Sequence, residues 1–144
     1  MADKWGRRLF DAGAVFLLLL GLIHSLSLLG KPLPKNETEK QLLDLVYTYK
    51  FNVMGSMRTY DDFMRGFSIS FMLASLVMGG LGLALRRERA ALLKRVALFY
   101  AAWLAVMSAV SLRYFFVFPT TCLLLALVIF VLSWIKLPAE TRVG

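Results

Sequence analysis

Cysteine and histidine are almost absent from this chain, which excludes several kinds of membrane chemistry. The sequence has one cysteine, Cys122, and one histidine, His24. A single cysteine excludes an internal disulfide and a CxxC redox pair, and a single histidine excludes a bis-histidine haem held by this chain alone. The sequence also has no HExxH, Walker or GxSxG motif and no paired metal-ligand spacing. We therefore predict no metal site and no disulfide-forming activity.

Acidic residues are also scarce, and the charge balance is strongly basic. Nine Asp and Glu stand against 17 Lys and Arg, for a net charge of +8. In a soluble protein this balance would suggest a nucleic-acid partner. However, 59% of the residues are hydrophobic and the mean hydropathy is +0.68, which is too apolar for an ordinary soluble domain. We expect a membrane protein with no nucleic-acid partner.

Polar residues are nearly missing from four long stretches of the sequence. A helix needs about 20 apolar residues to cross a bilayer core of ~30 Å. We predict spans at about 9–29, 60–86, 93–112 and 117–136, with an outer loop at 30–59. The predicted fold is all-α: one integral membrane domain over 1–144, built as an antiparallel four-helix bundle. The basic residues before the first span are also typical of a signal peptide, but we expect this segment to be retained as a helix.

The positive charge is unevenly divided between the two sides of the predicted bundle. With a cytoplasmic N-terminus, ten of the 17 basic residues lie inside: Lys4, Arg7, Arg8, Arg86, Arg87, Arg89, Lys94, Arg95, Lys136 and Arg142. The outer segments hold five acids that offset most of their basic residues. This pattern predicts that both termini are cytoplasmic. Membrane lipids with anionic headgroups would suffice as partners of the inner cluster.

The outer loop is too long to be only a connection. Apolar residues recur in it at helical spacing: Leu42, Leu45, Val46, Tyr49 and Val53. Asn36 with Glu39, or Thr38 with Gln41, would cap the start of this helix, and Gly55 suits the position after its end. We predict an amphipathic helix within Thr38–Met54, lying on the membrane surface or folded over the bundle as a lid.

Other residues predict where the spans begin and where they touch. Thr59 is a good N-cap for the second span, and Pro119 fits the first position of the fourth. Small residues, which let membrane helices approach closely, mark contact faces on the later spans: Ser68, Ser75, Gly79 and Gly82 on the second, and Ala101, Ala105 and Ser108 on the third.

His24 is the most informative single residue. It lies about five residues from the outer end of the first span, and an ionisable side chain inside a span is a functional candidate. The alternative is a packing role, with the ring bonded to a nearby serine or carbonyl. Asp61 and Arg65 have the i, i+4 spacing of a helical ion pair, but acids in a first turn also simply stabilise a helix.

Polar side chains from all four spans lie at the predicted outer interface. We predict that they form a ligand-binding mouth, although the same residues could serve only to tie the helix ends together. The candidate ligand-binding residues are His24, Asp61, Asp62, Arg65, Arg113, Tyr114 and Thr120. The inner halves of the spans are interpreted as scaffold with almost no ionisable residue.

Three short motifs stand out: Gly21–Leu26 late in the first span, Asp62–Ser68 at the start of the second, and Tyr114–Pro119 before the fourth. With these motifs the chain resembles small uncharacterised bacterial four-helix membrane proteins of the broad DoxX-like group. Some DoxX-like proteins are linked to quinone-dependent oxidation as subunits beside a catalytic partner. The resemblance therefore implies an accessory role and a bacterial inner (plasma) membrane, but it carries no catalytic residue onto this sequence.

Three functions remain open from the sequence. The first is an accessory subunit or a binder of a lipid-like or quinone-like molecule at the outer mouth. The second is a small membrane enzyme with His24 as general acid/base, supported by Asp61 or Asp62 and by Arg65 or Arg113. The third is a transporter or channel subunit that works as a homo-oligomer or with other membrane subunits. No cofactor is evident beyond a quinone or lipid.

Overall fold

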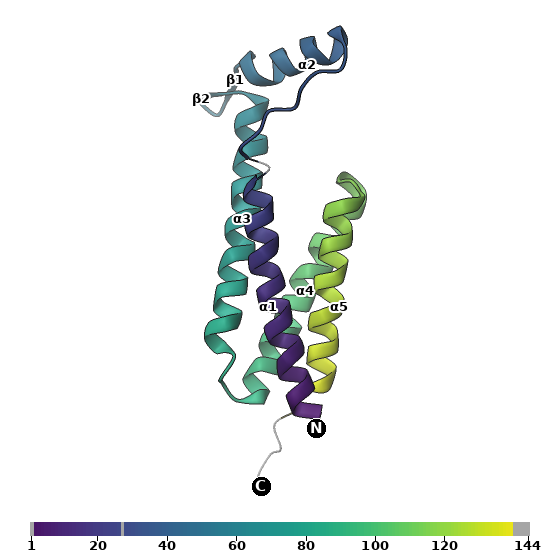
Figure 1. Cartoon of the computed structure of the whole chain (residues 1–144). Helices are drawn as coiled ribbons and strands as arrows, with labels where there is room; N and C mark the ends of the chain where they lie inside the picture. Colours follow the sequence, from purple (N-terminus) through teal and green to yellow (C-terminus); the bar gives the residue numbers. More distant parts are fainter. Residues whose placement is uncertain (1, 27, 140–144) are drawn as a thin grey trace. The chain divides into compact units, whose positions relative to one another are not determined.

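The computed structural model describes residues 2–26 and 28–139, and this range is mostly helical. The elements are α1 (Ala2–Leu26), α2 (Glu37–Thr48), β1 (Phe51–Val53), β2 (Ser56–Arg58), α3 (Tyr60–Leu85), α4 (Ala90–Tyr114) and α5 (Val117–Lys136) (Figure 1). Helices α1, α3, α4 and α5 are each long and apolar enough to cross a membrane. The four predicted spans are therefore found as helices. Their antiparallel bundle arrangement stays a prediction.

The helix ends differ from the predicted spans by a few residues. α1 begins at Ala2 rather than near residue 9, and α4 runs from Ala90 to Tyr114. Hydropathy detects only the apolar part of a helix, whereas the backbone continues into flanking turns that carry charge. Proline does not mark the start of α5: the helix begins at Val117, and Pro119 is its third residue. The first four N–H groups of a helix have no partner within it, so proline is tolerated there as well.

The chain divides into two compact units. The larger unit comprises Met1–Leu20 and Ser75–Gly144, and the smaller unit comprises Gly21–Ala74. The larger unit contains α4, α5 and parts of α1 and α3. The smaller unit contains α2, the two strands, and the remaining parts of α1 and α3.

The core of the larger unit is built around three aromatic rings. Phe10 of α1 meets Tyr100 of α4 at 6.4 Å and Phe130 of α5 at 5.8 Å between ring centroids, and Tyr100 meets Phe130 at 5.1 Å. Phe130 meets both other rings edge to face, whereas Phe10 and Tyr100 are nearly parallel. Aromatic pairs of both kinds stabilise a core beyond the area that they bury. Helices α4 and α5 pack side by side (Figure 1).

Small residues let helices of the larger unit approach closely. A Cβ placed on Gly79 would lie 2.7 Å from the carbonyl oxygen of Ala14, and one on Gly82 would lie 2.8 Å from Ala14 Cβ. The predicted contact positions Ser75, Gly79 and Gly82 are all buried. On α4, Ala101 and Ser108 are buried as predicted, but Ala105 is exposed, so its assignment to a contact face is wrong.

The predicted helix in the outer loop exists as α2, but it is shorter than expected. Asn36 is its N-cap, accepting a 2.8 Å hydrogen bond from the backbone N–H of Glu39. The Glu39 carboxylate in turn accepts from the N–H of Lys35 at 2.6 Å. The helix ends at Thr48, so the extension to Met54 is wrong.

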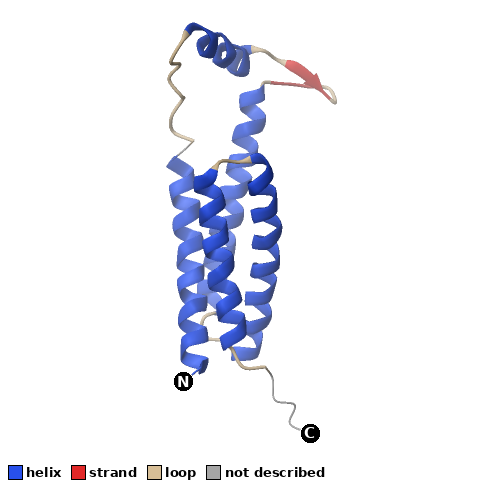
Figure 2. Ribbon diagram, turned by 90° about the vertical axis from the view of Figure 1, so that its right-hand side faces the viewer, coloured by secondary structure: helices blue, strands red, loops and turns tan. Residues whose placement is uncertain are grey.

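A β-hairpin takes the place of that extension (Figure 2). β1 and β2 pair antiparallel, with Val53 opposite Ser56. Met54 and Gly55 form the turn with φ of 49° and 89°, as in a type I′ turn, where both central residues need positive φ. Gly55 is therefore required by the hairpin, and its predicted place after the helix is wrong.

Candidate functional site

His24 lies in the last turn of α1, within the smaller unit. Its half-buried side chain meets the ring of Phe71 on α3 edge to face, with ring centroids 5.0 Å apart and an interplanar angle of 73°. This contact restricts how the imidazole can rotate. A neutral imidazole offers one donor and one acceptor nitrogen, so a ring held in this way can recognise a polar group with a preferred direction.

Arg65 is held at the start of α3 by two contacts. Its Nε lies 2.7 Å from the Asp61 carboxylate, which confirms the i, i+4 pair that the spacing predicts. Its Nη1 reaches the carbonyl oxygen of Leu28 at 3.5 Å, in the segment after α1. Because a guanidinium has five N–H donors, these two contacts leave donors for a further acceptor. Asp61 thus fixes a cation that can still bind an anionic or carbonyl group.

Asp62 closes a capping box with Thr59. The N–H of Thr59 donates to the Asp62 carboxylate at 2.8 Å, and the N–H of Asp62 donates to the Thr59 hydroxyl at 3.1 Å. The predicted N-cap at Thr59 is confirmed. The reciprocal bonds satisfy donors at the helix start that would otherwise lack partners, and so fix the direction in which α3 begins.

An aromatic group beside this helix start was missed by the sequence reasoning. The ring of Phe51 on β1 meets Tyr60 at 4.7 Å and stacks on Phe63 at 5.8 Å and 17°. The i, i+3 spacing of Tyr60 and Phe63 could have indicated a shared helix face. Phe51 could not have been included without the hairpin, which folds β1 back toward α3.

Within the smaller unit, Arg65 and His24 lie at different levels along the axis of α3. Arg65 and Phe71, the ring partner of His24, are six residues apart, which corresponds to about 9 Å along a helix. The arginine therefore marks the start of the apolar part of α3, and the histidine lies more than a turn further along. A molecule with a polar head and an apolar body could contact both side chains.

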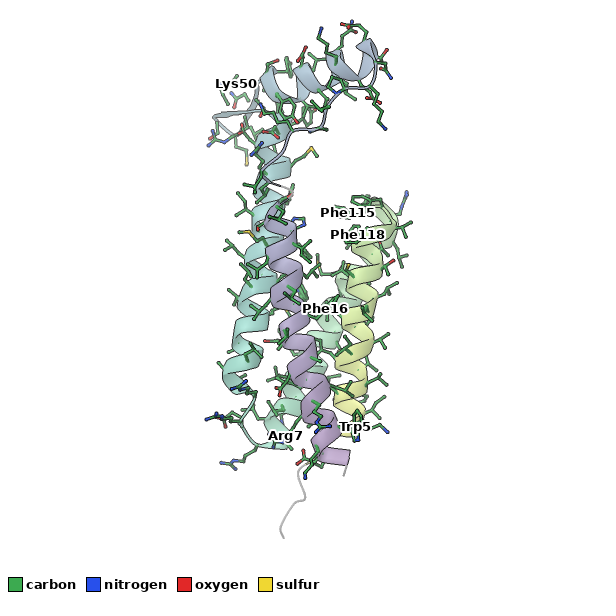
Figure 3. The ribbon with its side chains drawn as sticks, in the orientation of Figure 1. Trp5, Arg7, Phe16, Lys50, Phe115 and Phe118 are labelled. Atoms are coloured by element: carbon green, nitrogen blue, oxygen red, sulfur yellow. The ribbon has the colours of Figure 1, made fainter. Side chains whose placement is uncertain are left out.

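The other three candidates lie in the larger unit. Thr120 and Ser111 share a buried 2.7 Å hydrogen bond that links α5 to α4, and the Thr120 hydroxyl also donates to the carbonyl oxygen of Phe116 at 3.1 Å. The Arg113 guanidinium lies 5.7 Å from the ring centroid of its neighbour Tyr114. Figure 3 labels Phe115 and Phe118 at this end of the larger unit.

The seven candidates therefore fall into two groups. His24, Asp61, Asp62 and Arg65 belong to the smaller unit, whereas Arg113, Tyr114 and Thr120 belong to the larger one. The structure joins Asp61 to Arg65 directly. That all seven form one mouth stays a prediction.

Asp11 was also overlooked. It lies two residues inside the predicted first span, and its Oδ1 atom is buried without a hydrogen-bond partner among residues 2–26 and 28–139. In the larger unit, the hydroxyl oxygens of Ser75 and Ser108 are also buried without a hydrogen-bond partner among the described residues. The inner halves of the spans were interpreted as scaffold with almost no ionisable residue, and Asp11 is an ionisable residue in that region. The signal was visible in the sequence as a carboxylate in an apolar run.

No group of three or more His, Cys, Asp or Glu side chains in the described part of the chain is arranged to hold a metal ion. Comparison with protein families, curated proteins and solved structures found no match. The resemblance to DoxX-like proteins therefore stays a prediction, and the function has to be inferred from the residues themselves.

Proposed function

We propose that this chain is a non-enzymatic integral membrane protein that binds a lipid-like or quinone-like molecule at its predicted outer interface. His24 and Arg65 of the smaller unit would be the polar contacts, and Asp61 would position the arginine. Such a binder could act alone or as an accessory subunit. In this proposal the four apolar helices anchor the site in a bacterial inner membrane, with both termini cytoplasmic.

The placement of the two aspartates is the observation that carries this proposal over the catalytic alternative. A histidine general base usually needs a third group to orient it. Asp61 is bonded to Arg65 and Asp62 to Thr59, so both carboxylates already have local roles. Arg65 and His24 are instead held by neighbours in positions suited to recognition, a task that needs no proton transfer.

We expect an amphipathic ligand because the proposed site combines polar side chains with aromatic rings. Arg65 would hold a carbonyl or anionic head group by charge-assisted hydrogen bonds. The imidazole of His24 would bond a second polar atom deeper in the span. The nearby aromatic rings of Phe51, Tyr60 and Phe63 would pack against an apolar or aromatic body.

Mass spectrometry of molecules that co-purify with the protein tests this proposal. Wild type should retain a lipid-like or quinone-like molecule in gentle detergent, and His24→Ala should lose it without a change in thermal stability. Ser25→Ala is the matched control, since that hydroxyl donates to the carbonyl oxygen of Leu22 in its own helix. If His24→Ala keeps both the bound molecule and its stability, His24 has a packing role and the proposal fails. If His24→Ala is unstable, His24→Gln, which keeps a donor and an acceptor, must restore binding.

A further inference from the structure

One end of the larger unit gathers positive charge from three separate parts of the chain. The Arg7 guanidinium of α1 donates to the carbonyl oxygens of Arg86 and Glu88 in the turn before α4, at 3.4 and 2.8 Å. The Lys94 ammonium of α4 donates to the carbonyl oxygen of Leu137, just after α5, at 2.7 Å. The start of α1 therefore contacts the α3–α4 turn, and the start of α4 contacts the residue that follows α5. We call this the basic end; Figure 3 labels Arg7 and Trp5 there.

A cavity of about 260 Å³ opens between α4 and α5 at the basic end. Its walls combine two cations with apolar and aromatic surface: they are Ala91, Lys94, Arg95, Leu98, Trp134 and Ala139. The Lys94 ammonium lies 5.7 Å from the ring centroid of Trp134. Tryptophan at the end of a membrane helix is typical of the boundary between headgroups and hydrocarbon.

Lys94 has hydrogen-bonding capacity beyond its contact with α5. An ammonium carries three N–H donors, and one of them is used by Leu137. The side chain is half-buried one turn inside α4, where leaving donors without acceptors is costly. Arg95 is the adjacent residue and lines the same cavity. A phosphate at this position would supply several acceptors to both side chains.

The surface that leads away from the cavity is apolar. Leu98 follows Lys94 by one turn on α4 and is 49% exposed. Ala102 and Ala105 follow at further one-turn spacings and are exposed as well. A phosphate site that continues into a shallow apolar face matches a phospholipid, with its headgroup in the cavity and an acyl chain along the helix. Free phosphate has no apolar part that could contact this face.

We propose that this cavity is a binding site for an anionic phospholipid, whose phosphate contacts Lys94 and Arg95 and whose acyl chain lies along Leu98. Basic pockets between membrane helices bind such headgroups in other proteins. The site is in the larger unit and uses none of the residues of the proposed ligand site, so either proposal can fail without the other.

Native mass spectrometry of the full chain in detergent, with added phosphatidylglycerol or phosphatidylcholine, tests the site. Wild type should retain phosphatidylglycerol in preference, and Lys94→Gln should lower its retention about fivefold, the usual effect of one basic residue near anionic lipid. Lys94→Arg should largely restore it. Arg87→Gln is the matched control, because Arg87 is exposed in the α3–α4 turn of the basic end but does not line the cavity. Equal losses from Lys94→Gln and Arg87→Gln would indicate general attraction of lipid to positive charge and would overturn the site.

Two further measurements keep the proposal testable if Lys94→Gln does not fold. In vesicles containing phosphatidylglycerol with brominated acyl chains, tryptophan fluorescence of the wild type should be quenched more than with brominated phosphatidylcholine. Trp134→Phe should reduce that difference, whereas Trp5→Phe, which does not line the cavity, should preserve it. Equal quenching by the two lipids would count against the site. Inorganic phosphate should not displace the bound lipid at millimolar concentration; displacement would identify free phosphate as the occupant and overturn the proposal.

Discussion

Substitution of Gly79 tests the close contact between α1 and α3 in the larger unit. A Cβ at this position would lie 2.7 Å from the carbonyl oxygen of Ala14 and 2.8 Å from the backbone nitrogen of Leu18. Backbone atoms cannot rotate away, so the helices must separate. Overpacking of this kind costs about 1–3 kcal/mol. A Cβ on Gly80, the next residue, would have no such neighbour within 4 Å, which makes Gly80→Ala a matched control.

The expected free energies follow from two opposing effects. Alanine is favoured over glycine inside a helix by roughly 0.5–1 kcal/mol. Gly80→Ala should show only this gain, whereas Gly79→Ala should show the gain minus the overpacking cost. We therefore expect the free energy of unfolding of Gly79→Ala to be about 1–3 kcal/mol below that of Gly80→Ala. Reversible unfolding by sodium dodecyl sulfate in mixed micelles, followed by circular dichroism, measures both variants. Equal stability of the two variants would refute the close contact.

Three other substitutions have expected outcomes. Met54→Asn should stabilise the hairpin by about 1 kcal/mol, because asparagine tolerates positive φ at lower cost; hydrogen exchange of residues 51–58 measures this, and Met57→Asn on β2 should show no such gain. Thr59→Ala should destabilise the start of α3 by about 0.5–2 kcal/mol through loss of the capping box; an unchanged exchange rate in that first turn would show that the box contributes nothing. Ser111→Ala should lower the free energy of unfolding by roughly 0.6 kcal/mol, the average for hydrogen bonds between membrane helices. Thr121→Ala, whose hydroxyl donates to the carbonyl oxygen of Val117 in its own helix, should cost less, and the reverse order would contradict the assigned bonds.

The helices of this protein were predictable because their signals are long or local. Four apolar stretches of about 20 residues predict helices long enough to cross a membrane, and the part of the chain that the structure describes has four such helices. The caps at Asn36 and Thr59 and the Asp61–Arg65 pair each depend on residues three or four apart, so the sequence displays them directly. The errors occurred at helix ends, where the backbone continues past the apolar residues.

The hairpin was not predictable because its turn has an unusual residue. Asn-Gly is the pair that normally marks a type I′ turn, whereas Met54 occupies the first position here. The strands have only three residues each, too few to show alternation. The apolar stripe of α2 also continues as far as Val53, so helical spacing extended the prediction into β1.

The candidate site was predictable in its residues more than in its geometry. His24 and Arg65 were identified by their positions near the outer ends of predicted spans, and the i, i+4 spacing paired Arg65 with Asp61. The ring contact between His24 and Phe71 joins residues distant in sequence, which no local pattern reveals. Asp62 was selected for its charge, but its carboxylate accepts the N–H of Thr59 in the capping box.

Both proposed sites depend on the four helices crossing the membrane, with the outer loop and the basic end on opposite sides. Labelling of single cysteines with an impermeant maleimide on intact cells tests this most directly, in a Cys122→Ser background. Lys35→Cys, before α2, should react from outside, and Arg89→Cys, in the turn before α4, should react only after the membrane is opened. Reaction of both positions from the same side, or the reverse order, would contradict the account.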